Sequence, residues 1–323
     1  MERRKLGNSG IETAPLALGG NVFGWTADEP TSFKLLDAFI DAGFSFIDTA
    51  DIYSRWAPGN SGGESEAIIG KWLKRGASRQ KAVIATKVGM EMGPEKKGLS
   101  KAYILSEVEE SLRRLQTDYI DLYQSHADDQ STPIEETLEA YGSLIKQGKV
   151  RAIGASNYTG PRLLQALQAS DAKGLPRYES LQPLYNLYDR ADYETNLEPV
   201  CVANHLGVIS YYSLASGFLT GKYRSTADAA NVNRGQVVKK YLDDRGFRIL
   251  KALDKLAGDY RSTPAKIALA WLMARPSITA PIASATSLDQ LNELVDSTRL
   301  KLDPTAIQYL NDASRYSSEA SAR

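Results

Sequence analysis

The chain has 323 residues, of which 42% are apolar, and its 39 basic and 39 acidic residues give a formal net charge of zero. This length fits one large α/β domain or two modest domains. The balanced charge argues against a nucleic-acid-binding protein, which gathers an excess of Lys and Arg on one face. No apolar run approaches the roughly 18 residues of a membrane-spanning helix, so we expect no membrane span.

Few residues are available for disulfide or metal chemistry. Cys201 is the only cysteine and the chain has two histidines, which excludes an intramolecular disulfide and argues against a zinc site. The basic start of the chain is followed by Gly-Asn-Ser-Gly at residues 7–10, where a secretory signal needs an apolar stretch. We therefore expect a cytoplasmic protein without a metal centre.

The chain opens with a predicted β-hairpin and continues as a repeat of strand and helix. Residues 3–14, with a turn at Asn8-Ser9-Gly10, predict a hairpin that plugs one end of a barrel. Eight short apolar runs follow, separated by helical patterns with apolar residues every three or four positions. Several runs are apolar without alternation, which is typical of parallel strands covered on both faces. The runs are residues 15–20, 44–49, 82–88, 119–126, 150–156, 180–182, 208–212 and 278–283.

Segments outside the repeat lie in the last third of the chain. We expect a long polar loop at residues 220–243, an additional helix ending at Tyr260, and a last helix beginning at Pro304. The Ser- and Ala-rich residues 317–323 predict a disordered tail. Proline in the first turn supports three helix starts. These are Thr132-Pro133 with Glu135 as a capping box, Thr263-Pro264 and Asp303-Pro304.

Strand followed by helix, eight times with short links, predicts a (β/α)8 TIM barrel. An open doubly wound sheet is the alternative, but it normally carries Gly-x-Gly-x-x-Gly after its first strand, and this chain has no such turn. No linker or change of composition suggests a second domain. We therefore predict a single catalytic domain over residues 1–316, an α/β barrel with an N-terminal β-hairpin and extra C-terminal helices.

Polar residues stand at the ends of six of the eight predicted strands. In a barrel, the loops after these ends open onto one face, where the chemistry collects. Each residue taken alone could cap a loop or form a structural ion pair, but six converging strand ends favour a shared site. They are Asp48, Lys87, His126, Ser156 with Asn157, Gln182, and Tyr211 with Tyr212.

These side chains suit the reduction of a carbonyl group. Tyr53 follows Asp48 in the loop after the second strand, and a phenol with a reference pKa of about 10 is a poor acid near neutrality. A cationic neighbour lowers such a pKa, and Lys87 is the one lysine at a strand end. Asp48 can hold Lys87 in place, and His126 can orient an oxygen. No nucleophile–base pair is evident, so the set fits hydride addition to C=O better than hydrolysis.

Three motifs on successive strands resemble the signatures of the aldo-keto reductase superfamily. They are Asp48-Thr-Ala-Asp-Ile-Tyr53, Ala85-Thr-Lys87-Val-Gly and Leu122-Tyr-Gln-Ser-His126, and the resemblance extends from Arg3 to about Asp312. It implies an NADP(H)-dependent barrel with a catalytic tetrad, here Asp48, Tyr53, Lys87 and His126. Tyr53 would be the general acid of reduction and the general base of the reverse reaction.

The resemblance also implies where the cofactor lies. Ser156, Asn157 and Gln182 match contacts to the nicotinamide carboxamide, and Tyr211 matches the ring that stacks on the nicotinamide. Gly20 and Asn21 match the contact to the nicotinamide ribose, and Asp48 is shared with the tetrad. The pyrophosphate segment contributes Tyr212, Ser213, Leu214, Ser216, Gly217 and Lys222. The 2′-phosphate and adenine segment contributes Ala283, Ser284, Thr286, Gln290 and Glu293.

Two segments depart from the family pattern. Tyr212-Ser213-Leu214 stands where Ser-Pro-Leu is usual, and Leu294 replaces the usual Asn after Glu293. Ser284, Thr286 and Gln290 occupy places where Lys or Arg commonly meets the 2′-phosphate, a group that favours a cationic partner. NADP(H) is therefore the expected cofactor, and NAD(H) stays open.

The expected partner is a small carbonyl or alcohol substrate, and no pattern assigns an oligomeric state. Trp25 and Trp56, in loops leaving strands, could form an apolar substrate wall or cover the barrel rim. The first hypothesis is an aldehyde or ketone reductase. The second is a non-enzymatic or slow NADP(H)-binding redox sensor or regulatory subunit. The third is a phosphosugar isomerase, because the same fold carries many functions.

Overall fold

Eight parallel strands form the centre of the molecule in the computed structural model, which describes residues 2–76, 79–228 and 235–316. The strands are β3 (Ala17–Gly19), β4 (Phe46–Asp48), β5 (Val83–Val88), β6 (Ile120–Ser125), β7 (Val150–Ser156), β8 (Tyr178–Gln182), β9 (Gly207–Val208) and β10 (Ile282–Ala283). They pair in chain order from β3 to β9, with β10 beside β3. Hydrogen bonds of 2.8 Å from Thr279 N to Val208 O and from Ile282 N to Ser210 O join β10 to β9. The predicted (β/α)8 barrel is thus confirmed.

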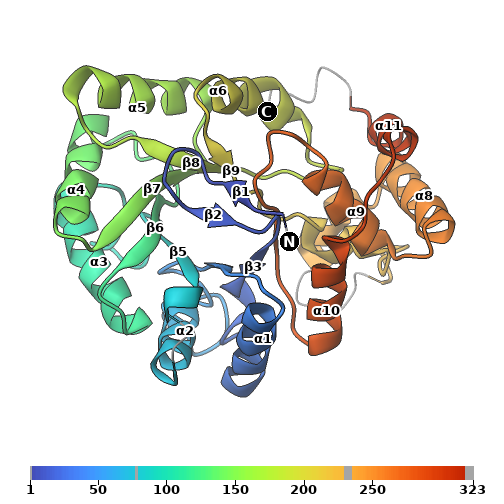
Figure 1. The fold of residues 1–323 in the computed structure, drawn as a ribbon, viewed down its shortest axis with the longest axis horizontal. Helices are drawn as coiled ribbons and strands as arrows, with labels where there is room; N and C mark the ends of the chain where they lie inside the picture. Colours follow the sequence, from blue (N-terminus) through green and yellow to red (C-terminus); the bar gives the residue numbers. More distant parts are fainter. Residues whose placement is uncertain (1, 77–78, 229–234, 317–323) are drawn as a thin grey trace.

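Helices surround the strands as a ring (Figure 1). The ring helices are α1 (Glu29–Asp41), α2 (Glu64–Lys74), α3 (Lys101–Leu115), α4 (Ile134–Lys146), α5 (Gly160–Lys173), α6 (Glu198–Ala203), α9 (Pro264–Met273) and α10 (Leu288–Ser297). The predicted extra helices are present as α8 (Asp244–Asp259) and α11 (Pro304–Ala313), which pack together beside α9 (Figure 1). No helix of the described ranges combines the length and the apolar character needed to cross a membrane.

Short helical turns complete the described structure. They are η1 (Gly20–Val22), η2 (Arg79–Lys81), the π-helix η3 (Tyr193–Leu197), η4 (Ala215–Thr220), α7 (Gly235–Val238) and η5 (Lys239–Tyr241). The predicted loop at residues 220–243 therefore ends in two helical turns, and its residues 229–234 lie outside the described ranges. The predicted disordered tail, residues 317–323, also lies outside them.

Side-chain caps explain where most helices begin. Thr263 and Asp303 cap α9 and α11 as predicted, because each side chain accepts a hydrogen bond from a backbone N–H of the first turn. The predicted capping box at Thr132 is wrong: α4 begins after Pro133, which has no side-chain cap. The Thr132 hydroxyl instead donates to Asp129 Oδ2 at 2.7 Å, since a nearby carboxylate is the stronger acceptor.

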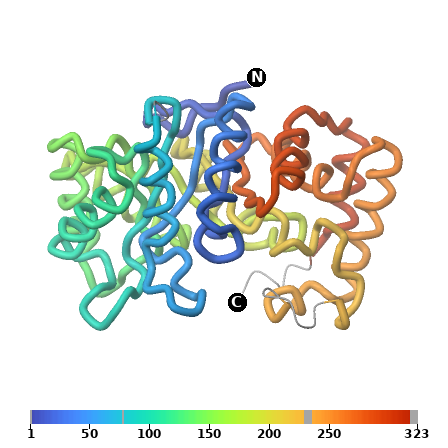
Figure 2. The backbone as a smooth tube through the Cα atoms, turned by 90° about the horizontal axis from the view of Figure 1, so that it is seen from below, coloured from blue at the N-terminus to red at the C-terminus, as the bar shows by residue number. Residues whose placement is uncertain are grey.

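The N-terminal hairpin closes the end of the barrel where the strands begin (Figures 1 and 2). Its strands are β1 (Arg4–Lys5) and β2 (Glu12–Thr13), which pair antiparallel. Leu6 and Ile11 are buried in a core cluster with inward-facing barrel residues such as Phe46. Gly7 permits this approach, because it has φ +56° and a Cβ there would lie 2.2 Å from the Glu179 carbonyl oxygen. The predicted plug is confirmed, and the opposite end is left for the site.

Candidate active site

The side chains at the ends of β4 and β5 meet around the ammonium group of Lys87. Lys87 Nζ donates hydrogen bonds of 2.8 Å each to Asp48 Oδ2, the Thr49 carbonyl oxygen and the Tyr53 hydroxyl. An ammonium group has three hydrogens, so these contacts use its whole donor capacity. Lys87 and Asp48 are buried, whereas Tyr53 is partly exposed. The structure thus joins three of the four predicted tetrad residues in one hydrogen-bonded group.

His126, the fourth predicted residue, lies beside the ring of Tyr53. The two ring centroids are 5.9 Å apart, and the planes meet at 73°. The backbone N of His126 donates to the Val88 carbonyl oxygen at 2.8 Å, which fixes the end of β6 beside the end of β5. His126 Nδ1 is buried and has no hydrogen-bond partner within the described residues. The imidazole is therefore placed by packing and by its backbone, next to the phenol.

The pairing of β5 with β6 places a further residue, Gln124, beside this hydrogen-bonded group. Lys87 pairs with Gln124 across β5 and β6, and the Gln124 amide nitrogen lies 3.5 Å from Asp48 Oδ1. The Gln182 amide donates to the same oxygen at 2.8 Å. Asp48 therefore divides its oxygens between an ammonium and amide groups. Sequence reasoning missed Gln124, although it precedes His126 by two positions and so shares its face of the strand.

The environment keeps the phenol of Tyr53 protonated. Burial raises the pKa of Tyr53 well above its ordinary value, and the negative charge of Asp48 raises it further. Lys87 does not bring the pKa of Tyr53 below its ordinary value, because burial has the larger effect and Asp48, 2.8 Å from the ammonium, offsets its charge. Burial also lowers the pKa of Lys87, against the opposing effect of Asp48. The phenol is therefore protonated at neutral pH.

Burial gives His126 a fixed protonation state as well. Burial and then the positive charge of Lys87 lower the pKa of His126 well below its ordinary value. The imidazole is therefore neutral near pH 7, with one nitrogen that donates and one that accepts. A neutral imidazole can donate a hydrogen bond to an oxygen without adding charge to the site.

The residues predicted to contact a nicotinamide lie together at the ends of β7, β8 and β9. Ser156 Oγ donates to the Gln182 carbonyl oxygen at 2.9 Å. Asn157 Nδ2 donates to the His126 carbonyl oxygen at 2.8 Å, and Asn157 Oδ1 accepts from the Tyr211 hydroxyl at 2.8 Å. A hydroxyl and two amides beside a phenol ring match a flat carboxamide, which both donates and accepts. This donor set fits the nicotinamide end of a dinucleotide.

The loop after β9 has the backbone of an anion-binding turn. The φ angle changes sign from −107° at Leu214 to +50° at Ala215, and Ser216 and Gly217 follow at +57° and +91°. A right-handed residue followed by a left-handed one is a backbone shape of anion-binding turns, and here Ala215 N and Gly217 N donate to the Tyr212 and Leu214 carbonyl oxygens within the turn. The side chain of Lys222 lies beside Gly217, since a Cβ there would be 3.0 Å from Lys222 Cε. The segment fits a pyrophosphate.

The residues that follow β10 and β3 are tied together by a hydrogen bond. Ser284 Oγ donates to Asn21 Oδ1 at 2.6 Å, and a Cβ on Gly19 would lie 2.5 Å from Ser284 Oγ. Ser65 Oγ donates to the Gly20 carbonyl oxygen at 2.8 Å. Gly20 and Asn21, the predicted ribose contacts, thus lie beside the predicted 2′-phosphate segment.

The residues predicted to contact the adenine and the 2′-phosphate do not form a single polar group. Thr286 donates to Gln290 Oε1 from its backbone N at 2.9 Å and from its hydroxyl at 3.1 Å. Glu293 instead accepts from the hydroxyl of Thr263, the residue that caps α9. Ala283 is buried within β10. Ser213, of the predicted pyrophosphate segment, is also buried, and its hydroxyl donates to the Ser210 carbonyl oxygen. Only Thr286 and Gln290 of this set present polar groups together at the surface.

Comparison with known proteins identifies the barrel. Residues 15–315 match the sequence model of the Aldo/keto reductase family. This chain belongs to that family. It is 36% identical to the uncharacterized oxidoreductase YrpG of Bacillus subtilis (strain 168), over 97% of this chain and 95% of that protein. It is 34% identical to the aldo-keto reductase YhdN of the same organism, over 92% and 89%. A probable voltage-gated potassium channel subunit beta of Arabidopsis thaliana is 32% identical over 91% and 90%.

Two tryptophans adjoin the tetrad of this aldo/keto reductase family member. The rings of Trp25 and Trp56 are 5.7 Å apart in an edge-to-face contact, and Trp56 lies 5.9 Å from the ring of Tyr53. Trp56 is 48% exposed, and Trp25 is partly buried. Tyr53 therefore has an indole and an imidazole as ring neighbours, each with its centroid 5.9 Å away.

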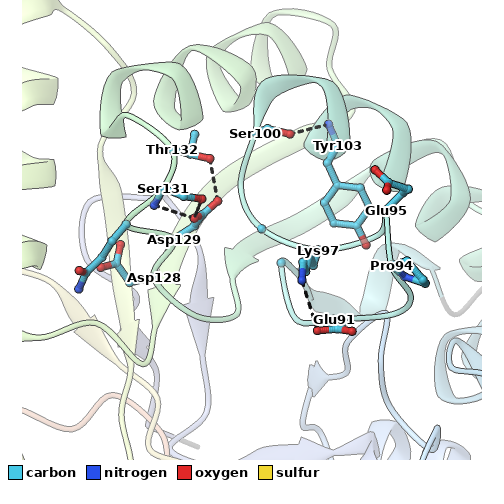
Figure 3. A pocket seen from close by; sticks show the side chains of 13 residues that line it. Glu91, Pro94, Glu95, Lys97, Ser100, Tyr103, Asp128, Asp129, Ser131 and Thr132 are labelled. Atoms are coloured by element: carbon cyan, nitrogen blue, oxygen red, sulfur yellow. Dashed lines mark hydrogen bonds and ion pairs between the residues drawn. The ribbon is translucent and has the colours of Figure 1, made fainter.

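A separate cavity of about 560 Å³ lies between the loops that follow β5 and β6 (Figure 3). Asp129, at its wall, accepts hydrogen bonds from Ser131, Thr132 and the Leu99 backbone (Figure 3 shows the first two). Burial raises the pKa of Asp129, but these hydrogen bonds outweigh burial and bring the value to about 2. No tetrad residue lines this cavity, so we place the site at the mouth of the barrel. In the described ranges, no cluster of three or more His, Cys, Asp or Glu side chains is placed to hold a metal ion.

Proposed function

We propose that this protein is an NADP(H)-dependent oxidoreductase that reduces an aldehyde or ketone, or oxidises the alcohol in reverse. The observation that carries this proposal is the group formed by Lys87, Asp48 and Tyr53, with Lys87 Nζ 2.8 Å from the Tyr53 hydroxyl. A protonated phenol held against an ammonium can donate its proton, and the ammonium lies where it can stabilise the phenolate that forms. The family membership and the names of two relatives as oxidoreductase and aldo-keto reductase support the same activity.

Each tetrad residue has a distinct role in this reaction. A bound nicotinamide supplies or accepts the hydride. Tyr53 donates its proton to the carbonyl oxygen in reduction and removes the alcohol proton in oxidation. Lys87 stabilises the phenolate that remains, and Asp48 holds Lys87 in position at 2.8 Å. The neutral His126 donates a hydrogen bond that orients the substrate oxygen.

The cofactor would lie across the strand ends that do not carry the tetrad. Ser156, Asn157 and Gln182 would hold the carboxamide, with Tyr211 against the nicotinamide ring. Gly20 and Asn21 would contact the ribose, and residues 212–222 would hold the pyrophosphate. Residues 283–293 would meet the adenosine end. Lys222, in the pyrophosphate segment, is the one basic residue of the predicted set, so a 2′-phosphate would depend on hydroxyl and amide donors.

A titration of protein fluorescence with NADPH and with NADH tests the cofactor assignment. We expect tighter binding of NADPH, because the hydroxyl and amide groups of Thr286 and Gln290 can donate hydrogen bonds to the 2′-phosphate, which NADH lacks. Equal affinity for the two dinucleotides would contradict the NADP preference. Failure to bind either would favour a phosphosugar isomerase on the same barrel.

The change Tyr53→Phe tests the catalytic assignment. We expect NADPH binding to persist and kcat for carbonyl reduction to fall by about 10²–10⁴-fold, the usual contribution of a positioned acid. Tyr103→Phe is the matched control, because its hydroxyl is buried without a partner in the described residues and its ring lines the cavity of Figure 3. Loss of activity in Tyr103→Phe alone would move the site to that cavity.

A regulatory subunit is the second candidate, favoured by the relative named as a probable voltage-gated potassium channel subunit beta. In that case NADPH would bind tightly, and the protein would turn over any carbonyl compound only slowly. Single-turnover and steady-state rates measured on one carbonyl panel separate the two candidates. Slow hydride transfer to every carbonyl compound tested, together with tight binding of NADPH, would favour the sensor.

The same proposal includes the compartment and the extent of the domain. We take the catalytic domain as one unit to residue 316, since β3–β10 form a single barrel and α11 packs on α8. We place the protein in the cytoplasm, because its only cysteine, Cys201, is a buried free thiol, as is usual where thiols stay reduced. The partner is a small carbonyl or alcohol compound.

A further inference from the structure

The first turn of α2 carries two buried polar residues, Ser65 and Glu66, on the outer side of the barrel. Gly63, the residue before the helix, has φ +87°, and a Cβ there would lie 2.4 Å from Arg114 Cδ of α3. The absence of a side chain at Gly63 therefore lets the start of α2 lie directly against α3. From this place the first turn reaches the ends of three barrel strands.

Ser65 connects the end of β4 to the end of β3. The Ser65 and Thr49 hydroxyl oxygens are 2.8 Å apart, and Ser65 Oγ donates to the Gly20 carbonyl oxygen at 2.8 Å. A hydroxyl has one hydrogen, so Thr49 is the donor to Ser65. Thr49 follows Asp48, and its own carbonyl oxygen accepts from Lys87 Nζ at 2.8 Å. The hydrogen bonds of Ser65 therefore hold a residue that contacts Lys87 directly.

Glu66 holds the strand that carries Lys87. The Thr86 hydroxyl donates to Glu66 Oε1 at 2.6 Å, and Arg114 Nε donates to Glu66 Oε2 at 2.7 Å. Thr86 precedes Lys87 in β5, and neighbouring residues of a strand point to opposite faces. The contact with Glu66 on the outer face therefore fixes the backbone from which Lys87 points inward.

Glu66 also lies within electrostatic range of the ammonium group. Burial lowers the pKa of Lys87, and the negative charges of Asp48, Asp51 and Glu66 oppose this effect. Asp48 accepts a hydrogen bond from Lys87 Nζ inside the barrel, whereas Glu66 acts from the outer face. Residues on both faces of the strand thus act on the same ammonium.

The rest of α2 is held to the barrel by other contacts. Ile69, Trp72 and Leu73 are buried in the main apolar core, and Trp72 Nε1 donates to Asp37 Oδ1 of α1 at 2.6 Å. An apolar face is enough to dock a helix of this kind. Buried polar groups destabilise the fold unless their partners are complete, so those of the first turn call for a role beyond docking.

We propose that Ser65 and Glu66 are positioning residues that set the spacing of Asp48 and Lys87 from the outer face of the barrel. This inference rests on the proposed function and concerns the geometry of the same site. Lys87 must lie against the Tyr53 hydroxyl to stabilise the phenolate that forms. A misplacement of about 1 Å in an active site can lower the rate by roughly 10²-fold.

The experiment compares Thr86→Val with Ser65→Ala, using the best substrate of the carbonyl panel. Thr86→Val keeps the shape of the side chain and removes the hydroxyl that binds Glu66. We expect kcat to fall about tenfold with an unchanged Kd for NADPH, and Thr86→Ser should restore kcat. Ser65→Ala should lower kcat by a similar factor and should also weaken NADPH binding, because it releases Gly20.

Two matched controls separate positioning from the mere loss of a buried contact. Ser170→Ala removes a buried hydroxyl of α5 that donates to a backbone carbonyl at 2.8 Å, and Asp37→Ala removes the hydrogen bond to Trp72 of α2. Both controls should leave kcat and its solvent deuterium isotope effect unchanged. In Thr86→Val this isotope effect should rise, because proton transfer from Tyr53 becomes slower. Equal values of kcat in Thr86→Val and Ser170→Ala would overturn the proposal.

A measurement without turnover tests the inference separately from the proposed function. In protein labelled with ¹³C at tyrosine Cζ, the Tyr53 signal, assigned with Tyr53→Phe, reports the contact between the phenol and the ammonium. We expect this signal to move in Thr86→Val and in Ser65→Ala and to stay in place in Ser170→Ala. If the wild type reduces no carbonyl compound, the proposed function fails, but a moved signal would still support the positioning role. A signal at the wild-type position in both variants would overturn that role.

Discussion

The two ends of the barrel are built from opposite kinds of contact. At the closed end, Leu6 and Ile11 of the hairpin fill the space between the strands with apolar side chains. At the mouth, Lys87 and Asp48 are equally buried but charged, and Tyr212 adopts a left-handed backbone conformation that is strained for a bulky residue. Burial of charge destabilises a fold unless the partners are complete. The closed end therefore stabilises the fold, whereas the mouth holds buried charges that would destabilise the fold without their partners.

The largest effect should follow from breaking the buried pair at the mouth. Asp48→Asn leaves the ammonium of Lys87 buried without its counter-ion, so we expect a loss of about 3–5 kcal/mol in the free energy of unfolding, together with most of the activity. Urea unfolding at neutral pH measures the loss of stability. The double change Asp48→Asn with Lys87→Met should recover much of the stability and none of the activity. An Asp48→Asn protein as stable as the wild type would contradict the claim that the pair is buried.

At the closed end of the barrel we expect a loss of stability with little loss of activity. Leu6→Ala removes a fully buried side chain from the closed end, and we expect a loss of about 2–5 kcal/mol in the free energy of unfolding with little change in kcat of the folded protein. Ile11→Val, in the same cluster, is the graded control and should cost about 0.5–1.5 kcal/mol. A large fall in kcat with unchanged stability would show that the two ends are not independent.

The smallest effect is a pH dependence of stability at His126. Its pKa is lowered in the folded protein, so the unfolded chain takes up a proton near pH 6.5 that the folded chain does not. The stability is therefore fully present above about pH 6.5 and falls as the pH drops toward the folded pKa, by up to about 1.4 kcal/mol per pH unit.

In His126→Gln this contribution should vanish, and unfolding curves at pH 7, 6 and 5 measure the difference in slope. The wild type and the variant share His205 and the buried Asp51, whose pKa burial raises, so these residues cancel in the difference. Equal slopes in the two proteins would contradict the neutral state of His126.

Local patterns were enough to predict most of the fold. The strand and helix repeat, the hairpin plug and the caps at Thr263 and Asp303 depend on neighbouring residues, and the structure confirms each of them. The cap at Thr132 failed because the side chain found Asp129, a partner outside the helix pattern. A helix cap predicted from neighbouring residues therefore fails where a stronger hydrogen-bond acceptor lies near the capping side chain in the folded protein.

The sequence by itself determined the residue types of the site and the order of the strands that carry them, because both are written in short motifs and a regular period. Only the tertiary structure decided the direction of the pKa shift at Tyr53, the division of the Asp48 oxygens between Lys87 and Gln182, and the contact of Tyr211 with Asn157. These properties depend on burial and on distances between groups far apart in the chain, such as the 134 positions that separate Asp48 from Gln182. Electrostatic energy follows distance and solvent access in the folded molecule, and neither is a property of neighbouring residues in the sequence.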